Sequence, residues 1–224
     1  WQAMRNCWFR WSAVLLLAVV TVYAGGRVVT AQDSPFDLLI INGRIMDGTG
    51  NPWRRADIGV RNGRIAAIGV LGDARAERRI DAGGQLVTPG FIDVHSHAGE
   101  GLAREGLGQG KPLLAQGITT IVVNPDGGGP VDLDQQRQLL ESNGLGLNIA
   151  LLIGHAAVRR DVLAMADRTP TEEEMVEMQR LVRRGMEAGA YGLSSGLFYA
   201  PGSYATTEEI VALGSVVAEF GGLY

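Results

Sequence analysis

The chain has 224 residues, of which 46% are hydrophobic and 20% are charged, and its formal net charge is -4. This length corresponds to one domain or one and a half, and the apolar fraction allows a sizeable core, which excludes wholesale disorder. The modestly acidic balance argues against a nucleic-acid partner, because an anionic surface repels the phosphate backbone.

Residues 1–31 have the pattern of an export signal rather than of a folded domain. Arg5 and Arg10 precede the apolar run 13–24, and the small residues at 29–31 are typical of a signal-peptidase site. A membrane-spanning helix needs roughly 20 apolar residues. The run 13–24 is shorter than that, which favours a cleaved signal over an uncleaved anchor. We therefore expect an exported protein, periplasmic or secreted, that touches a membrane only through this segment. Cleavage would also remove Cys7, leaving no disulfide and no thiolate metal ligand.

Residues 36–86 predict a small antiparallel β domain of the sandwich type. Asn42-Gly43 and Asn62-Gly63 each stand between two strand-like runs, and further short runs lie at 77–80 and 86–87. Asn-Gly between strands is the strongest short-range hairpin signal, because both turn positions need positive φ. The pattern therefore predicts two hairpins, in a sheet that is incomplete and too thin to be stable alone.

From residue 87 onward, predicted strands alternate with predicted helices, which indicates parallel βα units and an α/β fold. The expected strands lie at 91–94, 119–123, 147–153 and 191–193, and the expected helices at 113–116, 133–141, 171–187 and 206–220. Residues 222–224 begin a fifth strand. A closed (β/α)8 TIM barrel needs eight strands and about 250 residues. Residues 87–224 are therefore predicted to be the first half of such a barrel, truncated in mid-pattern.

His95 and His97 are the first candidates for chemistry. The apolar Phe91, Ile92 and Val94 predict a short buried strand that ends at this His-x-His. Side chains two apart on a strand point to the same face, so the two imidazoles can bind one divalent metal ion. The alternative is that both are ordinary surface histidines, which the sequence alone leaves open.

Other polar residues follow the next three predicted strands, where a barrel carries its active site. Asp126 follows the second strand, His155 the third, and Ser194 and Ser195 the fourth. With His95 and His97 they offer a ligand set for a catalytic zinc with a position left for water, suited to amide hydrolysis. Asp126 has the alternative role of a turn residue in a Gly-rich loop.

Four segments resemble a known family. They are PGFIDVHSH (89–97), GITTIVV (117–123), GHAAVR (154–159) and GLSSGLFYAPG (192–202). The first resembles the amidohydrolase superfamily, a family of metal-dependent hydrolases with a TIM barrel, and the others resemble its N-acyl-D-amino-acid deacylases, also called D-aminoacylases. The resemblance runs from about residue 37 to the last residue.

The resemblance implies hydrolysis of an N-acyl amino acid, a small-molecule substrate, with one or two zinc ions as cofactor. His95 and His97 match the family's His-x-His, Asp126 stands where many members have a zinc-binding cysteine, and His155 matches a Gly-His near the metal centre. Ser195 and Tyr199 match residues that line the substrate site, and Ser194 is expected to hydrogen-bond the substrate beside them. The resemblance also implies that the general base lies in a missing C-terminal half, so that this chain alone would be inactive and poorly folded.

Two alternatives to this function remain. Related dihydroorotases and hydantoinases bridge two metals with a carboxylated lysine after the fourth strand, but the lysine of this chain, Lys111, lies in the first loop. A non-catalytic or inactive fragment of an amidohydrolase is the second alternative.

Arg159 and its neighbour Arg160 are candidates for pairing with a substrate carboxylate. The competing interpretation is that both are solvated or paired with neighbours such as Asp161.

Overall fold

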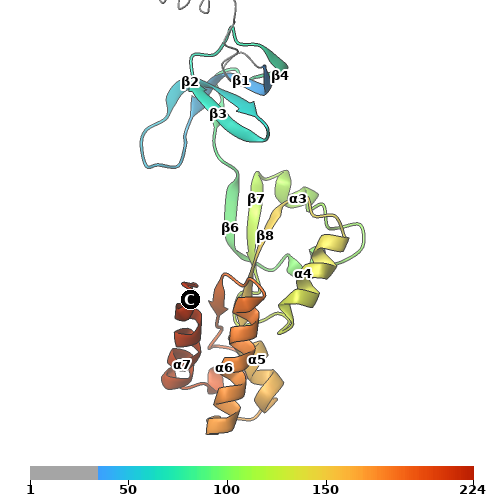
Figure 1. Ribbon diagram of the computed structural model, residues 1–224, viewed down its shortest axis with the longest axis vertical. Helices are drawn as coiled ribbons and strands as arrows, with labels where there is room; N and C mark the ends of the chain where they lie inside the picture. Colours follow the sequence, from blue (N-terminus) through green and yellow to red (C-terminus); the bar gives the residue numbers. More distant parts are fainter. Residues whose placement is uncertain (1–34) are drawn as a thin grey trace, which may run out of the picture. The chain divides into compact units, whose positions relative to one another are not determined.

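The computed structural model describes residues 35–224, and the predicted signal segment at 1–31 lies outside them. The described residues divide into two compact units, with the boundary between Pro89 and Gly90; the sequence analysis placed the boundary between residues 86 and 87. The described part of the first unit consists of strands and loops, and the second alternates strands with helices (Figure 1). No helix within residues 35–224 combines the length and the apolar character that crossing a membrane requires.

The first unit is a mixed five-stranded sheet. Its strands are β1 (Phe36–Ile45), β2 (Arg54–Arg61), β3 (Arg64–Gly69), β4 (Ala76–Asp81) and β5 (Leu86–Val87). The order is β3-β2-β1-β4, with β5 also paired to β1. The pairs β1–β2 and β2–β3 are antiparallel, as predicted, whereas β4 and β5 run parallel to β1. Ile45, Ala56 and Ile58 form a small buried cluster between the strands.

One of the two predicted hairpins forms and the other does not. Asn62 and Gly63 have positive φ and join β2 to β3, with Arg61 paired to Arg64. The hairpin predicted at Asn42-Gly43 is wrong, because β1 continues through these residues with a bulge in its pairing to β2. Asn42 takes the positive φ of 59° as the bulge residue and donates its backbone N–H to Asp57. Asn-Gly therefore supplies the local conformation, and the partner strand decides whether it becomes a turn.

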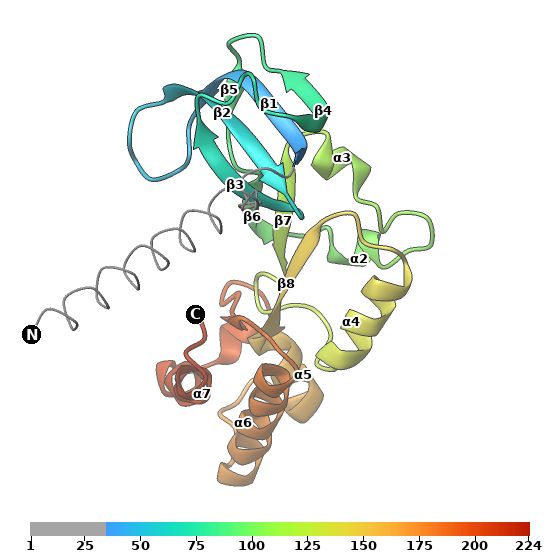
Figure 2. The ribbon, with the colours of Figure 1, turned by 45° about the horizontal axis from the view of Figure 1, so that its top comes forward.

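The second unit is built on a parallel sheet with the order β6-β7-β8-β9 (Figure 2). Its elements are β6 (Phe91–Ser96), α2 (Gly99–Leu102), α3 (Lys111–Leu114), β7 (Ile118–Val123), α4 (Leu133–Ser142), β8 (Asn148–Gly154), α5 (His155–Leu163), α6 (Glu172–Glu187), β9 (Gly192–Ser194), η1 (Gly202–Tyr204) and α7 (Thr207–Glu219). A parallel bridge from Gly192 to Leu223 marks the predicted start of a fifth strand. Four successive parallel βα units are the fold of half a (β/α)8 barrel.

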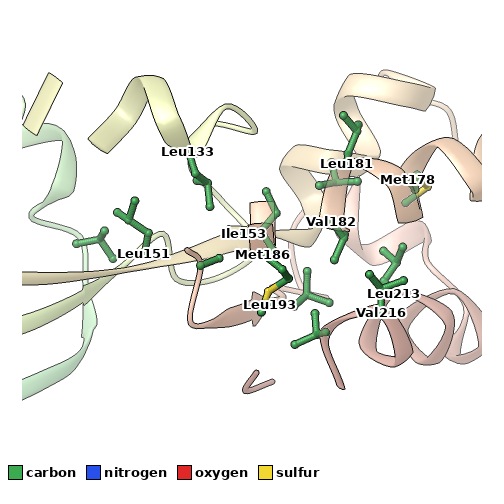
Figure 3. Close-up of a cluster of buried hydrophobic side chains, with 14 of the residues drawn as sticks. Leu133, Leu151, Ile153, Met178, Leu181, Val182, Met186, Leu193, Leu213 and Val216 are labelled. Carbon is green, nitrogen blue, oxygen red and sulfur yellow. The ribbon is translucent and has the colours of Figure 1, made fainter. Parts of the chain in front are cut away.

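The apolar stripe of α6 forms the centre of this unit's core. Met178 and Val182 are fully buried and pack with Ile153 of β8, Leu193 of β9 and Leu213 of α7 (Figure 3). The helix begins with a capping box, in which the Thr171 side chain accepts the backbone N–H of Glu174 and the Glu174 side chain accepts that of Thr171. The spacing of apolar residues and the cap together fix the helix against the sheet.

The prediction that β6 is a buried strand is wrong for its apolar residues. Phe91, Ile92 and Val94 are 58%, 62% and 72% exposed. These side chains point to the faces of the sheet, and no described element covers them there; β6 is also an edge strand, with β7 as its neighbour on one side. An apolar run therefore identified the strand correctly but did not determine how much of it other elements cover.

Candidate metal centre

The candidate residues lie at the carboxyl ends of neighbouring parallel strands. His95 is the penultimate residue of β6, His97 follows the end of that strand at Ser96, and Asp126 follows the end of β7 at Val123. Since parallel strands end at the same edge of a sheet, the loops after β6 and β7 lie side by side (Figure 2). The sheet topology thus brings together residues that are far apart in the sequence.

His95, His97 and Asp126 form a compact group of three potential ligands. Nε2 of His95 and Nε2 of His97 each lie 3.3 Å from Oδ2 of Asp126. All three ligand atoms lie within 4.8 Å of one another, and the two imidazole centroids are 5.4 Å apart. The two histidine side chains are largely exposed and Asp126 is partly buried. The group therefore faces solvent and is accessible to an ion.

The geometry of this group fits a bound metal ion. Ligand atoms about 2.05 Å from one tetrahedral ion lie roughly 3.3 Å from each other, which is the separation between Asp126 Oδ2 and each imidazole nitrogen. Two imidazole nitrogens and one carboxylate oxygen are a donor set that zinc and other divalent transition metals accept. The three side chains can thus hold a metal without rearrangement of the backbone.

Asp126 owes its position to a strained and tightly held loop. Its φ is 56° and that of Asn124 is 63°, both in the left-handed region that non-glycine residues rarely adopt. Ser194 holds the two ends of this turn: its hydroxyl donates to the Asn124 carbonyl at 2.6 Å and accepts the Gly127 N–H at 3.1 Å. The Ala157 N–H of α5 donates to the Gly127 carbonyl at 2.9 Å. The strain is therefore maintained by contacts from β9 and α5.

Glycines let these elements approach the Asp126 loop closely. A Cβ added to Gly154 would lie 2.1 Å from the Gly128 carbonyl oxygen, and one added to Gly196 would lie 2.3 Å from the carbonyl oxygen of Asp126. Both separations are far inside van der Waals contact, and the atoms met are backbone. The absence of a side chain at these positions is thus a condition for the observed placement of Asp126.

A cavity of about 1000 Å³ opens beside the three ligands. His97 and Asp126 line it together with Glu100 of α2, Arg160 of α5 and Tyr199. A volume of this size is that of a small-molecule site. Tyr199 therefore lines a cavity that two of the candidate ligands, His97 and Asp126, also line.

His155 does not join the group, although the sequence analysis expected it to be a ligand. Its ring is fully buried, and Nε2 lies 2.8 Å from Oε1 of Glu209 in α7. Because a carboxylate accepts only, Nε2 must carry the proton and cannot bind a metal in this arrangement. Nδ1 is buried without a hydrogen-bond partner among the described residues. Nε2 of His155 is thus bound to a carboxylate 54 positions along the chain, away from the group of His95, His97 and Asp126.

Arg159 does not lie in a substrate site either, in contrast to its predicted role. It is fully buried, pairs with Oε2 of Glu209, and donates to the carbonyls of Ala166 and Arg168. Burial raises the pKa of Glu209, but hydrogen bonds from His155 and Arg159 outweigh it and hold that pKa below its usual range. His155, Arg159 and Glu209, which we call the buried triad, therefore tie the start of α7 to α5.

The two serines have different surroundings. Ser194 is buried and its hydroxyl proton is used within the Asp126 loop, so it holds that loop rather than contacting the cavity. The Ser195 hydroxyl lies 2.7 Å from the hydroxyl of Tyr224 in an exposed pair. The sequence analysis did not identify Glu209 as a site residue. Thr206 accepts the backbone N–H of Glu209 as a helix cap, and nothing local indicated that the Glu209 carboxylate turns inward.

Comparisons with known proteins identify the class to which this arrangement belongs. Residues 78–222 match the profile of the amidohydrolase family, and residues 20–88 match that of the N-terminal domain of the urease alpha-subunit. Because the first match spans more than half of the chain, the chain belongs to the amidohydrolase family.

Within that family, the predicted resemblance to the N-acyl-D-amino-acid deacylases is confirmed. D-aminoacylase of Alcaligenes xylosoxydans xylosoxydans is 37% identical in an alignment of 217 positions that covers 87% of this chain and 44% of that protein. A solved D-aminoacylase described with a binuclear metal centre has a TM-score of 0.77 at 35% identity, over 85% of this chain and 44% of the other. N-acyl-D-glutamate deacylase from Bordetella bronchiseptica, solved with zinc and a phosphonate mimic of the tetrahedral intermediate, has a TM-score of 0.72 at 36% identity, over 83% and 44%. The chain spans somewhat less than half the length of these relatives.

Proposed function

We propose that the full-length protein containing this chain hydrolyses N-acyl-D-amino acids to a carboxylate and a free D-amino acid, with one or two zinc ions as its cofactor. The observation that carries the proposal is the group of His95, His97 and Asp126 at the rim of a cavity of about 1000 Å³. The names of the relatives support the substrate class, since they act on N-acyl-D-amino acids.

The chemistry divides between the ion and the side chains of this chain. A bound zinc ion supplies a Lewis acid that polarises an amide carbonyl and lowers the pKa of a coordinated water. His95 and His97 would hold the ion through ring nitrogens, and Asp126 would hold it through a carboxylate oxygen. Ser194 keeps the Asp126 loop in place, and Tyr199 offers a ring and a hydroxyl to the substrate from the same cavity.

The alternative of cyclic-amide hydrolysis has no supporting observation in the described residues. Lys111 opens α3, which precedes β7, so it lies at the amino end of the strand whose carboxyl end leads to Asp126. A carboxylated lysine bridging two metals would have to lie at the carboxyl edge of the sheet. Ser194, which occupies the corresponding place after the fourth strand, carries no amine.

The test uses the full-length protein after removal of metal by a chelator. We expect hydrolysis of N-acetyl-D-amino acids to disappear on removal and to return with zinc. Asp126→Asn should weaken zinc binding at least roughly tenfold, because the group loses its negative charge. Asp134→Asn is the matched control, since Asp134 is an exposed residue of α4 paired with Arg137. Zinc-loaded protein that hydrolyses no N-acyl-D-amino acid, or that opens hydantoins instead, contradicts the proposal.

We also propose that the protein is exported through residues 1–31 and acts in the periplasm or outside the cell. The support is the sequence pattern of Arg5 and Arg10, the apolar run 13–24 and the small residues at 29–31. N-terminal sequencing of the protein recovered from the periplasm should begin at residue 32. Full-length protein found with residues 1–31 attached in the cytoplasm contradicts this proposal.

A further inference from the structure

The Asp126 loop has a further support, which comes from helix α4. The side chains of Asn124 and Gln136 form a reciprocal amide pair. Nδ2 of Asn124 donates to Oε1 of Gln136 at 2.9 Å, and Nε2 of Gln136 donates to Oδ1 of Asn124 at 3.0 Å. Nδ2 of Asn124 also donates to the carbonyl oxygen of Leu152 in β8 at 2.9 Å. A helix and a strand thus hold the Asn124 side chain at the same time.

The surroundings of the pair leave the Asn124 amide a single orientation. Asn124 is 8% exposed, and a Cβ added to Gly129 would lie 2.4 Å from the Asn124 Cγ atom. Turning the amide over would set its oxygen against the Leu152 carbonyl oxygen, and two acceptors cannot form a hydrogen bond. The bonds to Gln136 and Leu152 therefore determine how the backbone leaves the end of β7.

A short and restricted stretch of backbone connects Asn124 to Asp126. Asn124 has a φ of 63°, and the ring of Pro125 fixes the φ of the next residue. The Gly128 N–H donates to the Pro125 carbonyl at 3.0 Å, and the two residues between them, Asp126 and Gly127, have φ of 56° and 73°. These are the positive φ values of a type I′ turn, with Asp126 as its first central residue. A change in the direction of Asn124 is therefore carried to the Asp126 carboxylate through few free dihedral angles.

The candidate metal centre tolerates little movement of that carboxylate. Oδ2 of Asp126 lies 3.3 Å from Nε2 of His95 and from Nε2 of His97, a separation that suits ligands of one ion. Metal–ligand distances in proteins stay within about 0.2 Å of their ideal values. A small rotation of the turn that contains Asp126 is thus sufficient to weaken the site.

We propose that Gln136 is a positioning residue of the candidate metal centre, which raises the affinity for the ion by holding Asn124 and, through it, Asp126. This inference rests on the proposed metal-dependent function. Gln136 acts through the amide pair and is not itself a ligand. Because Gln136 belongs to α4, the proposal links the packing of this helix to a metal ligand in the loop after β7.

The test compares Gln136→Met with Gln135→Met in the full-length protein. Methionine has nearly the length of glutamine but lacks its donor and strong acceptor. Loss of an outer hydrogen-bond partner of a metal site typically costs 10–100-fold in affinity, so Gln136→Met should weaken zinc binding roughly tenfold in competition with a chelator. Gln135 is the matched control, because it is the exposed neighbour in α4, lines the same cavity and makes no side-chain hydrogen bond within residues 35–224. Its variant should bind zinc as tightly as wild type.

Two further measurements separate positioning from a merely structural role. The visible absorption of Co²⁺-substituted protein depends on the arrangement of the ligands, and it should change in Gln136→Met but not in Gln135→Met. Asn124→Gly keeps the positive φ and removes the amide, so it should weaken zinc binding as Gln136→Met does. Combining the two changes should add little, because both act through the same pair.

Gln136→Met that lowers the free energy of unfolding but leaves zinc affinity and the cobalt spectrum unchanged overturns the proposal. So do equal losses of zinc affinity in the Gln136 and Gln135 variants. None of these measurements requires turnover. If zinc affinity depends on Gln136 as expected but the zinc-loaded wild type hydrolyses no N-acyl-D-amino acid, the proposed function fails while the positioning role stands.

Discussion

Replacing Glu209 by Gln is the most informative change that the structure suggests. Glu209 is 1% exposed and is the shared acceptor for His155 and Arg159, both of which are fully buried. Glutamine keeps the length and nearly the shape of the side chain, but it removes the negative charge. The variant therefore leaves a buried guanidinium without a counterion while changing little else in the packing.

The magnitude follows from burial. Removing one partner of a buried ion pair costs about 3–5 kcal/mol, because the remaining charge is left uncompensated in a poorly polarisable interior. Glu219 in the same helix provides the control, because it forms an exposed ion pair. Its side chain is 55% exposed, and that of its partner Arg183 is 41% exposed. Exposed pairs contribute about 0–1 kcal/mol. Glu209→Gln should therefore destabilise the protein by several times as much as Glu219→Gln.

The assay is urea unfolding of the full-length protein followed by far-ultraviolet circular dichroism. Among the described residues the helices all belong to the second unit, so the helical signal that residues 35–224 contribute comes from the unit that contains the triad. Amide hydrogen exchange in α7 gives a local measure of the same effect. Equal losses of unfolding free energy in Glu209→Gln and Glu219→Gln would refute the reasoning, because burial would then not determine the cost. A double replacement, Glu209→Leu with Arg159→Met, should recover much of the stability.

The same group predicts a pH dependence with a definite sign. Burial raises the pKa of Glu209, yet the hydrogen bonds from His155 and Arg159 hold it below the ordinary value of 4.5. A carboxyl with a depressed pKa stabilises the fold above its unfolded pKa and loses that contribution as the pH falls through the folded one. Wild type should therefore lose stability below pH 4.5 more steeply than Glu209→Gln, as acid unfolding would measure.

Further predictions concern the metal loop and the α6 cap. Gly154→Ala should displace the loop, because the new methyl would meet the Gly128 carbonyl at 2.1 Å, and zinc affinity measured by competition with a chelator should fall markedly. Ser194→Ala leaves two buried backbone groups of that loop without a partner, so unfolding free energy should fall by about 1–3 kcal/mol, whereas an unchanged value would contradict the role of this hydroxyl. Thr171→Ala should cost about 0.5–2 kcal/mol of unfolding free energy as a lost N-cap. The pKa of Glu174, lowered to about 2 by the Arg168 side chain and by the cap, should be measurable by NMR titration.

Local sequence patterns were sufficient for most of the second unit. The helix expected at 171–187 forms as α6, because its apolar spacing and its Thr171–Glu174 cap depend on residues three or four apart. The His95-x-His97 pair likewise requires no more than the alternation of a strand. Strand-helix alternation then placed these histidines and Asp126 at one edge of the sheet, where the structure brings their ligand atoms together.

Local patterns failed to predict the environment of a residue where a contact with a residue distant in the sequence determines it. Asn42 has the backbone conformation of a hairpin residue, but the pairing of β1 with β2 makes it a bulge. His155 ends a strand in the same way as His95, but Glu209, 54 positions away, takes its nitrogen. Arg159 and Arg160 are adjacent residues of the same type. The orientation of α5 against its neighbours makes Arg159 a core residue, whereas Arg160 lines the cavity.

The sequence by itself determined the order of strands and helices, the family and the two imidazoles on one face, because these depend on short-range periodicity and on contiguous motifs. The tertiary structure decided that Asp126 lies next to the two imidazoles, that His155 is buried away from them and that Arg160 lines the cavity. Those outcomes depend on contacts such as that between Ser194 and Asn124, 70 positions apart. Such contacts leave no periodic trace in the chain, and they exist only once the parallel strands have aligned their ends.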